Sequence, residues 1–349
     1  MDLPAGVRNF SYAKDMAIFR TKTHWAMLLL LFVLLFTAPL YFGNHWLSVA
    51  NLIGITIIAA TGLNILTGYC GQLSIGHAGF IAVGAYTSAV LTNRLEMPFL
   101  VGLISAGLLT GFVGMVFGIP SVRVKGFYLA ISTIAAQFII IWIINHWAGV
   151  TGGGNGISVP PAEIAGITFV SQGSQFYLIT GIAILVVFFA KNLARTRAGR
   201  AFIAIRDNDL AAEVMGINLF RYKLLAFFIG CFLAGIAGSL MAHWIGFINA
   251  EHFNIMDSIL YIGMIIIGGL GTTVGPIFGV LFIRLLQQGI SFISPVLEST
   301  FNLPAGFTSG IGPMVFGLVI ILFLILEPRG LAHRWQLFKV SYRLWPFSY

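Results

Sequence analysis

Charged residues are scarce in this sequence. Asp, Glu, Lys and Arg make up only 9% of its 349 residues, and 58% are hydrophobic, whereas a soluble domain carries about 25% charged residues. So little charge cannot cover a water-facing surface, and one soluble core could not bury this much apolar surface. The composition therefore excludes a soluble enzyme, a nucleic-acid-binding protein and a disordered chain. It indicates a polytopic membrane protein with no nucleic acid partner.

Cysteines and catalytic motifs are also lacking. Cys70 and Cys231 lie in or beside apolar segments, and two isolated thiols form neither a metal site nor a disulfide framework. We interpret both as small packing residues. The sequence holds no Walker A motif, and its 11 acidic residues are dispersed, with no nucleophile paired to a base. We therefore expect no catalytic residue, no metal site and no cofactor bound by this chain.

Long apolar runs, in contrast, are abundant. A helix needs about 20 apolar residues to cross the hydrocarbon core of a bilayer, and ten runs approach that length. They predict an all-α fold, a transmembrane helical bundle of about ten spans. The runs are 26–43, 47–67, 75–92, 99–119, 126–147, 176–190, 223–247, 257–271, 275–293 and 310–327.

The basic residues predict how this bundle is oriented. In the ten-span arrangement all but two of the 19 Lys and Arg residues fall on one side. Because cytoplasmic loops are enriched in Lys and Arg, we expect a multi-pass protein of the cell (inner) membrane with both termini in the cytoplasm. Residues 1–25 would form a cytoplasmic N-terminal segment and 328–349 a cytoplasmic tail. The transmembrane domain would span 26–327, with a cytoplasmic loop at 191–223.

Arg284 is unusual because it falls near the middle of the ninth run. A charge at that depth costs about 2.5–3.5 kcal/mol on insertion scales, so it normally faces protein or water. Two interpretations stay open. Arg284 either belongs to a structural ion pair (or to a span with different bounds), or it lines a substrate path.

Small residues at helical spacing predict close helix packing. Gly107, Gly111, Gly114 and Gly118 lie three and four residues apart, on one face of the fourth run. Between membrane helices no hydrophobic effect operates, so backbones must approach closely to hold a bundle together. We interpret this glycine stripe as a packing seam without chemistry.

The longest polar stretch between runs is the loop 191–223. Its segment 199–206 is mostly apolar with basic residues at its ends. Asp209 can cap a short helix over 210–215, and Gly216 is a natural stop after it. Such an amphipathic helix can lie on the lipid surface or fit into a groove on a cytoplasmic partner. Arginine together with small residues favours docking to a protein.

The segment 67–88 is too rich in glycine and polar residues for a lipid-facing helix. Irregular backbone at membrane depth is tolerated only where it is buried in protein or lines a cavity. Gln72, Ser74 and His77 are the polar side chains that could face such a cavity, although a lone buried histidine is more often a hydrogen-bonded packing residue.

Two further segments are rich in glycine. The stretch 268–276 could interrupt a helix and leave backbone groups free for a substrate carboxylate or ammonium, or it could be a tight turn between two spans. The stretch 151–157 lacks the Lys-Ser/Thr of a P-loop and is interpreted as a turn cluster in an outer loop. The candidate substrate-path residues are therefore Gln72, Ser74, His77, Gly268, Gly269, Gly271, Thr272 and Arg284.

Several sequence blocks occur together in one order: G-Y-C-G-Q-L-S-I-G-H-A-G-F-I-A-V-G-A-Y, V-K-G-F-Y-L-A-I-S-T-I-A, T-G-G-G-N-G-I and G-R-A-F-I-A-I-R-D-N-D-L-A-A-E-V-M-G-I. The stretches G-G-L-G-T-T-V-G-P-I-F-G and E-P-R-G-L follow them. From about residue 50 to residue 331 the chain thereby resembles the LivM-type permease subunits of ABC importers for branched-chain amino acids.

The resemblance implies a division of labour. Such permeases work with a second, related permease subunit, two cytoplasmic ATPase subunits that bind ATP and Mg, and an extracytoplasmic substrate-binding protein. The family's ATPase-docking loop falls on 199–216. The residues that we assign to this coupling loop are Arg200, Arg206, Asp207, Asp209, Ala211, Ala212, Glu213 and Gly216.

Two alternatives to a branched-chain amino acid importer stay open at this point. Related importers carry urea, amides or small aromatic acids. A stand-alone, ion-coupled secondary transporter would need carboxylates inside its spans, but Asp257 and Glu327 lie at span ends. Under each of these readings we expect the chain to contact membrane lipid.

Overall fold

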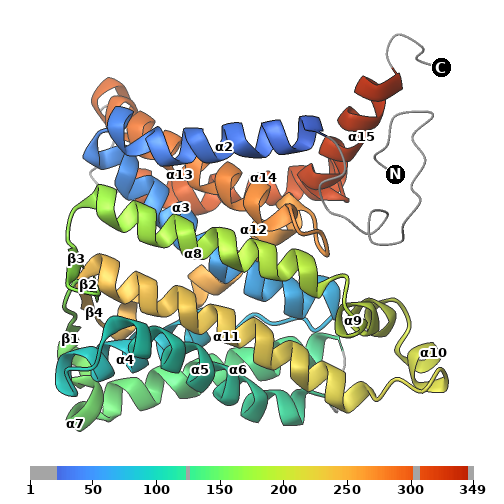
Figure 1. Ribbon diagram of the computed structural model, residues 1–349, viewed down its shortest axis with the longest axis horizontal. Coiled ribbons are helices and arrows are strands. Elements are labelled where there is room, and N and C mark those ends of the chain that lie inside the picture. Colours follow the sequence, from blue (N-terminus) through green and yellow to red (C-terminus); the bar gives the residue numbers. More distant parts are fainter. Residues whose placement is uncertain (1–21, 123–125, 302–306, 345–349) are drawn as a thin grey trace.

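The computed structural model of the protein describes residues 22–122, 126–301 and 307–344. Most of this part is helical, and the long helices lie side by side (Figure 1). The long helices before the loop 191–223 are α2 (Lys22–Tyr41), α3 (Asn44–Leu63), α4 (His77–Arg94), α5 (Phe99–Val122), α6 (Phe127–His146) and α8 (Gln172–Leu193). Those after it are α11 (Leu219–Ile245), α12 (Ile255–Gly268), α13 (Gly275–Phe301) and α14 (Phe307–Leu326).

Short elements cover the two ends of the bundle. At one end lie α7 (Ala148–Thr151), η2 (Gly153–Asn155), β1 (Ile157–Ser158), β2 (Ala162–Ile164), β3 (Ile167–Phe169), β4 (Phe247–Ile248) and η3 (Ala250–His252). Strand β1 pairs antiparallel with β4, and β2 pairs antiparallel with β3. At the other end, on the right in Figure 1, lie α9 (Arg197–Asp207), α10 (Asp209–Val214) and α15 (Gly330–Leu344).

The glycine-rich stretch 151–157 lies at the strand end of the bundle. It contributes α7, η2 and the start of β1. Gly152, Gly153 and Gly156 all have positive φ angles, of 75°, 58° and 69°, which glycine adopts without steric cost. The stretch is therefore the turn cluster that its composition predicts.

The structure bears out a polytopic helical membrane protein. Within the described residues, seven helices are long and apolar enough to cross a membrane, or eight if the bent pair 312–326 and 330–341 forms one span. All ten predicted runs coincide with helices, but the apolar part of α2 is short and α4 is not apolar enough to count. Helix α4 is less apolar because most of its side chains are buried by other helices and do not contact lipid.

Helix α11 lies at the centre of the packing, against α5, α4 and α3. The four glycines of the α5 stripe face it: a Cβ on any of them would lie within about 3 Å of side chains on α11, such as Phe227, Phe228 and Phe232. The predicted packing seam is therefore confirmed. Gly84 of α4 and Gly235 of α11 bring two further backbones into direct contact.

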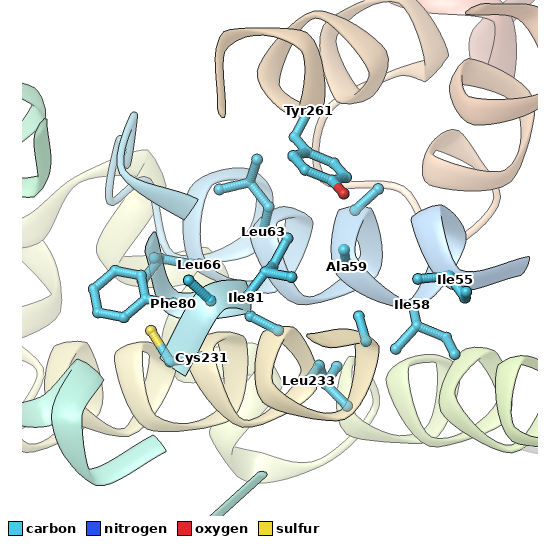
Figure 2. Close-up of a cluster of buried hydrophobic side chains, with 14 of the residues drawn as sticks. Ile55, Ile58, Ala59, Leu63, Leu66, Phe80, Ile81, Cys231, Leu233 and Tyr261 are labelled. Atoms are coloured by element: carbon cyan, nitrogen blue, oxygen red, sulfur yellow. The ribbon is translucent and has the colours of Figure 1, made fainter. Parts of the chain in front are cut away.

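The apolar core lies between α3, α4, α11 and α12. Figure 2 shows side chains from these helices meeting in one cluster, with Leu63 of α3, Phe80 of α4 and Tyr261 of α12 among them. Such packing stabilises a membrane bundle through close contact, because lipid tails are as apolar as the side chains themselves.

The chain is irregular between α3 and α4, as the glycine-rich segment 67–88 predicts. Helix α3 continues into a π-helix, η1 (Asn64–Tyr69), and no regular helix follows until His77. The irregular part is buried in protein: the Ile75 amide donates to Thr133 Oγ1 of α6 at 3.0 Å, and Thr67 Oγ1 donates to the Gln72 carbonyl at 3.0 Å. The Ile75 amide and the Gln72 carbonyl thus find protein partners, as buried backbone groups in a membrane protein must.

Candidate functional site

The loop 191–223 forms two short helices that differ in how they contact the bundle. In α9 the Thr196 side chain caps the first turn by accepting from the Gly199 amide at 3.2 Å. Ala201, Phe202 and Ile205 are buried on one face of α9, which lies against α11 and η1. The predicted amphipathic segment therefore docks its apolar face onto its own chain.

Helix α10 begins one residue earlier than expected, and its cap is different. The Asn208 side chain, not that of Asp209, accepts from the Ala211 amide at 3.1 Å. Asp209 is the first residue of the helix, and its carboxylate lies 3.8 Å from the Nζ of buried Lys223. The expectation that Asp209 caps this helix is therefore wrong, because its carboxylate faces the Lys223 ammonium. Gly216 does end the segment, with a φ of +84°.

Helix α10 holds an exposed apolar surface at the end of the molecule. Leu210, Val214 and Met215 are 66%, 87% and 82% exposed, while Ala212 is buried. The coupling-loop residues Ala211, Glu213 and Gly216 lie on the same exposed segment. Apolar side chains this exposed outside the long helices indicate a contact surface rather than a core.

Arg206 connects the loop to the bundle. Its Nη1 donates to the carbonyl of Gly68 in η1 at 3.0 Å, and its Nε and Nη2 donate to the Asp207 carboxylate at 2.9 and 2.8 Å. The Arg200 guanidinium instead donates within the loop, to the Arg195 carbonyl at 2.8 Å. Of these two arginines, Arg206 is the one that reaches a membrane helix.

The stretch 268–276 is a tight turn between α12 and α13. The Asn64 side chain of η1 holds it: Nδ2 donates to the Thr272 carbonyl at 2.9 Å, and Oδ1 accepts from the Gly271 amide at 3.0 Å. Thr272 Oγ1 donates to the Gly269 carbonyl at 2.9 Å. These backbone groups are thus hydrogen-bonded within the protein, and they are not free to bind a substrate.

Gly271 is the point where three elements meet. A Cβ at this position would contact the Arg206 guanidinium and the Gly68 carbonyl. Gly269 approaches α15 in the same way, at Ala332. The turn 268–276, η1, α9 and α15 therefore form one packed junction, which we call the coupling junction.

The structure places Gln72, Ser74 and His77 in three different surroundings. Gln72 lines a cavity of about 350 Å³ beside the coupling loop, together with Arg206, Asp209 and Lys223. Ser74 is fully buried. The Nε2 of His77 lies 2.9 Å from the Ala59 carbonyl of α3, and its ring packs edge-on against Tyr261.

Arg284 extends from α13 to α3. Its Nη2 and Nε donate to Thr56 Oγ1 at 3.0 and 3.3 Å, and its Nη1 donates to Gln287 Oε1 at 3.1 Å. The ion pairs within the described residues do not include Arg284. The predicted substrate-path residues thus lie in separate places. The glycines and Thr272 belong to the coupling junction, Gln72 lines the cavity beside it, His77 is buried against α3, and Arg284 lies between α13 and α3.

Asn64 and Lys223 did not stand out in the sequence, although both prove central to the coupling junction and its cavity. A polar residue inside an apolar run is the signal that marks Asn64, since a buried amide must find partners. Within the described ranges, the His, Cys, Asp and Glu residues do not gather in groups of three or more that could hold a metal ion.

Comparison with known proteins places this arrangement in a family. Residues 45–326 match the family model described as "Branched-chain amino acid transport system / permease component". Over 328 aligned positions the chain is 30% identical to the high-affinity branched-chain amino acid transport system permease protein LivM of Escherichia coli, covering 87% of this chain and 74% of that protein.

Two relatives of lower identity are also permease proteins for branched-chain amino acid transport. A probable LivM of Methanocaldococcus jannaschii is 26% identical, covering 80% of this chain and 90% of the relative. The permease protein LivH of Escherichia coli is 23% identical, covering 86% and 98%. No solved structure matches the chain significantly. The matched range contains α3 to α14, the π-helix and the coupling loop, and the chain therefore belongs to the family of branched-chain amino acid transport system permease components.

Proposed function

We propose that this chain is a transmembrane permease subunit of a binding-protein-dependent, ATP-driven importer for branched-chain amino acids. Membership of the permease family supports this function, and the roles of its relatives in branched-chain amino acid transport support the substrate class. The relatives are transport components and not enzymes. In our proposal this chain binds no nucleotide, and partner ATPase subunits bind ATP and Mg and hydrolyse the ATP.

The observation that carries the proposal is the exposed apolar surface of α10. We infer that Leu210, Val214 and Met215 insert into a groove on an ATPase subunit, as an amphipathic helix does. The alternative, contact with lipid, is less favoured because Asp209 and Glu213 lie on the same two turns. Burying Val214 and Met215 would supply about 3–6 kcal/mol of contact free energy before the costs of association.

The coupling junction can transmit movement of the docked helix α10 to the membrane helices. Movement of α10 and α9 would be passed by Arg206 to the π-helix, and by Asn64 to the turn 268–276. That turn joins α12 to α13, so a displacement there tilts two spans relative to α3. Small displacements at such a packed junction are amplified into alternating access because the packed elements move as rigid bodies.

The proposed topology has ten spans, with both termini in the cytoplasm of a cell (inner) membrane. Its domains are a cytoplasmic segment at 1–25, the transmembrane permease domain at 26–327 and a cytoplasmic tail at 328–349. In support of this topology, α9, α10 and α15 lie at the same end of the bundle (Figure 1), and α9 and α15 each carry three Lys or Arg residues. We place the strand end outside, where a substrate-binding protein would dock.

The experiment is extraction of the protein from its native membrane, followed by mass identification of what accompanies it and by uptake assays. We expect a second related permease, ATPase subunits and ATP-dependent uptake of leucine, isoleucine or valine in liposomes supplied with the binding protein. Extraction of the chain alone, in a detergent that preserves other such complexes, would contradict the proposal. Uptake driven by an ion gradient without ATP would do the same.

A further inference from the structure

Three helices that pack together, α3, α12 and α13, bring polar side chains to one seam deep in the bundle. Arg284 lies nine residues after the start of α13, or about 14 Å along the helix axis. Thr56 of α3 accepts two hydrogen bonds from its guanidinium, and Gln287 accepts a third. A half-buried charge at this depth cannot face lipid cheaply, so this seam faces water or a partner subunit.

An acidic residue lies across the seam from Arg284. Asp257 and Tyr261 are one turn apart on α12 and therefore share a face, and both interact electrostatically with Arg284. Yet within the described residues no ion pair of 4.0 Å or less joins Asp257 to Arg284. The two opposite charges therefore interact across a separation longer than that of an ion pair.

Arg284 retains hydrogen-bonding capacity toward this space. A guanidinium has five N–H groups, and three of them donate to Thr56 and Gln287. One N–H remains on each of Nη1 and Nη2, and this pair is the fork that binds a carboxylate with two hydrogen bonds. Asp257 is half-buried. Its carboxylate accepts a hydrogen bond from the Asn254 backbone amide, and because an ionised carboxylate has about four lone-pair sites, it can still accept from an ammonium.

We propose that Arg284 and Asp257 form the site at which this subunit receives an α-amino acid in transit, with the α-carboxylate on Arg284 and the α-ammonium near Asp257. The inference rests on the proposed function and extends it. A zwitterion carries both charges on one carbon and bridges the two residues. Urea and amides carry neither charge, and a simple carboxylic acid carries only one, so the seam favours amino acids over these solutes.

The first test needs no variant. The complete transporter, extracted with its native partners, is reconstituted in liposomes, and ATP-dependent uptake of leucine, isoleucine and valine is measured. If none of the three amino acids is taken up, the proposed function is wrong and so is the proposed site. If uptake occurs, a diazirine-bearing leucine analogue is irradiated with the reconstituted complex, and cross-linked peptides are mapped by mass spectrometry. We expect cross-links on α12 and α13 that excess leucine removes. Cross-links removed by leucine but confined to other helices would overturn the site.

The second test separates substrate contact from a structural role. Without the binding protein, we expect leucine to compete for cross-linking about ten-fold better than 4-methylpentanoate, which lacks the ammonium. In Asp257→Asn that preference should vanish. Uptake should also fall about ten-fold in Asp257→Asn and in Arg284→Lys, which keeps the charge but loses the fork. The matched control for the cross-linking assay, which contains no binding protein, is Glu251→Gln, an exposed acidic residue before α12. Wild-type selectivity and uptake within two-fold in both variants would overturn the proposal.

Discussion

The guanidinium of Arg206 donates a 3.0 Å hydrogen bond to the carbonyl of Gly68, which lies 138 residues earlier in the chain. Gly68 lies near the end of the π-helix, where carbonyls lack partners within the helix, and a cation there is favoured by the helix dipole. This bond fastens helix α9 of the loop 191–223 to the end of a membrane span. It is the first link between the proposed ATPase-docking surface and the bundle.

Replacing Arg206 tests this link. In Arg206→Ala we expect the amount of amino acid imported per ATP hydrolysed to fall about five-fold, which corresponds to about 1 kcal/mol of lost coupling. The ATPase subunits should still co-purify, because α10 is unchanged. Arg197→Ala is the matched control, since Arg197 lies exposed at the start of the same helix. Equal import per ATP in the two variants would rule out this role of Arg206.

Asn64 is expected to matter for both stability and coupling. In Asn64→Ala the Gly271 amide and the Thr272 carbonyl lose their partner, and each unsatisfied buried group costs about 1–3 kcal/mol. We expect a lower thermal unfolding midpoint of the purified complex and weaker coupling of uptake to hydrolysis. Asn64→Asp keeps the shape but cannot donate to the Thr272 carbonyl when ionised. An unfolding midpoint equal to that of the wild type in both variants would contradict this account.

The exposed surface of α10 gives a prediction about assembly. A charge in Val214→Asp or Met215→Asp would have to be buried in the proposed ATPase groove, so the ATPase subunits should be lost from the purified complex. Val214→Ile keeps the apolar character and serves as the control. Retention of the ATPase subunits in both Asp variants would show that α10 does not dock there. At Glu213 and Gly216, bulky or oppositely charged residues should uncouple hydrolysis from transport, which the amount of amino acid imported per ATP hydrolysed measures.

Close backbone packing gives a prediction about stability. At Gly84 a side chain would collide with the backbone of Gly235, so Gly84→Leu must separate α4 from α11 at a cost of about 1–3 kcal/mol or more. Gly181→Leu is the control, because Gly181 has open space on α8. We expect reduced yield and a lower unfolding midpoint for the first variant, with wild-type behaviour for the second. Similar midpoints for the two variants would refute the packing argument.

Much of the architecture follows from the sequence. Charge content, long apolar runs and the spacing of Gly107, Gly111, Gly114 and Gly118 depend on local composition and helical periodicity. They predict the membrane class, the helices and the α5 seam, and these predictions are confirmed by the structure. The sequence also predicts an amphipathic helix in the loop 191–223, because its segment 199–206 is mostly apolar with basic residues at its ends.

The assignment of polar residues to a common path could not be made from the sequence. Gln72, His77 and Thr272 are all polar residues in glycine-rich segments, yet one lines the loop cavity, one binds the Ala59 carbonyl and one is held by Asn64. The cap of α10 was misassigned for a similar reason. Asn208 and Asp209 are both good caps, and only the position of Lys223, in another helix, directs the Asp209 carboxylate elsewhere.

The sequence by itself thus determined that the chain spans a membrane and which family it resembles. It also determined where the long helices begin and end to within a few residues, except for the end of α13. These properties depend on composition and on neighbours along the chain. Only the tertiary structure decided that α9 binds the π-helix, that Asn64 holds the α12–α13 turn and that Arg284 donates to Thr56 of α3. Each of those contacts joins residues far apart in sequence, and no local pattern encodes which distant helix a polar side chain will meet.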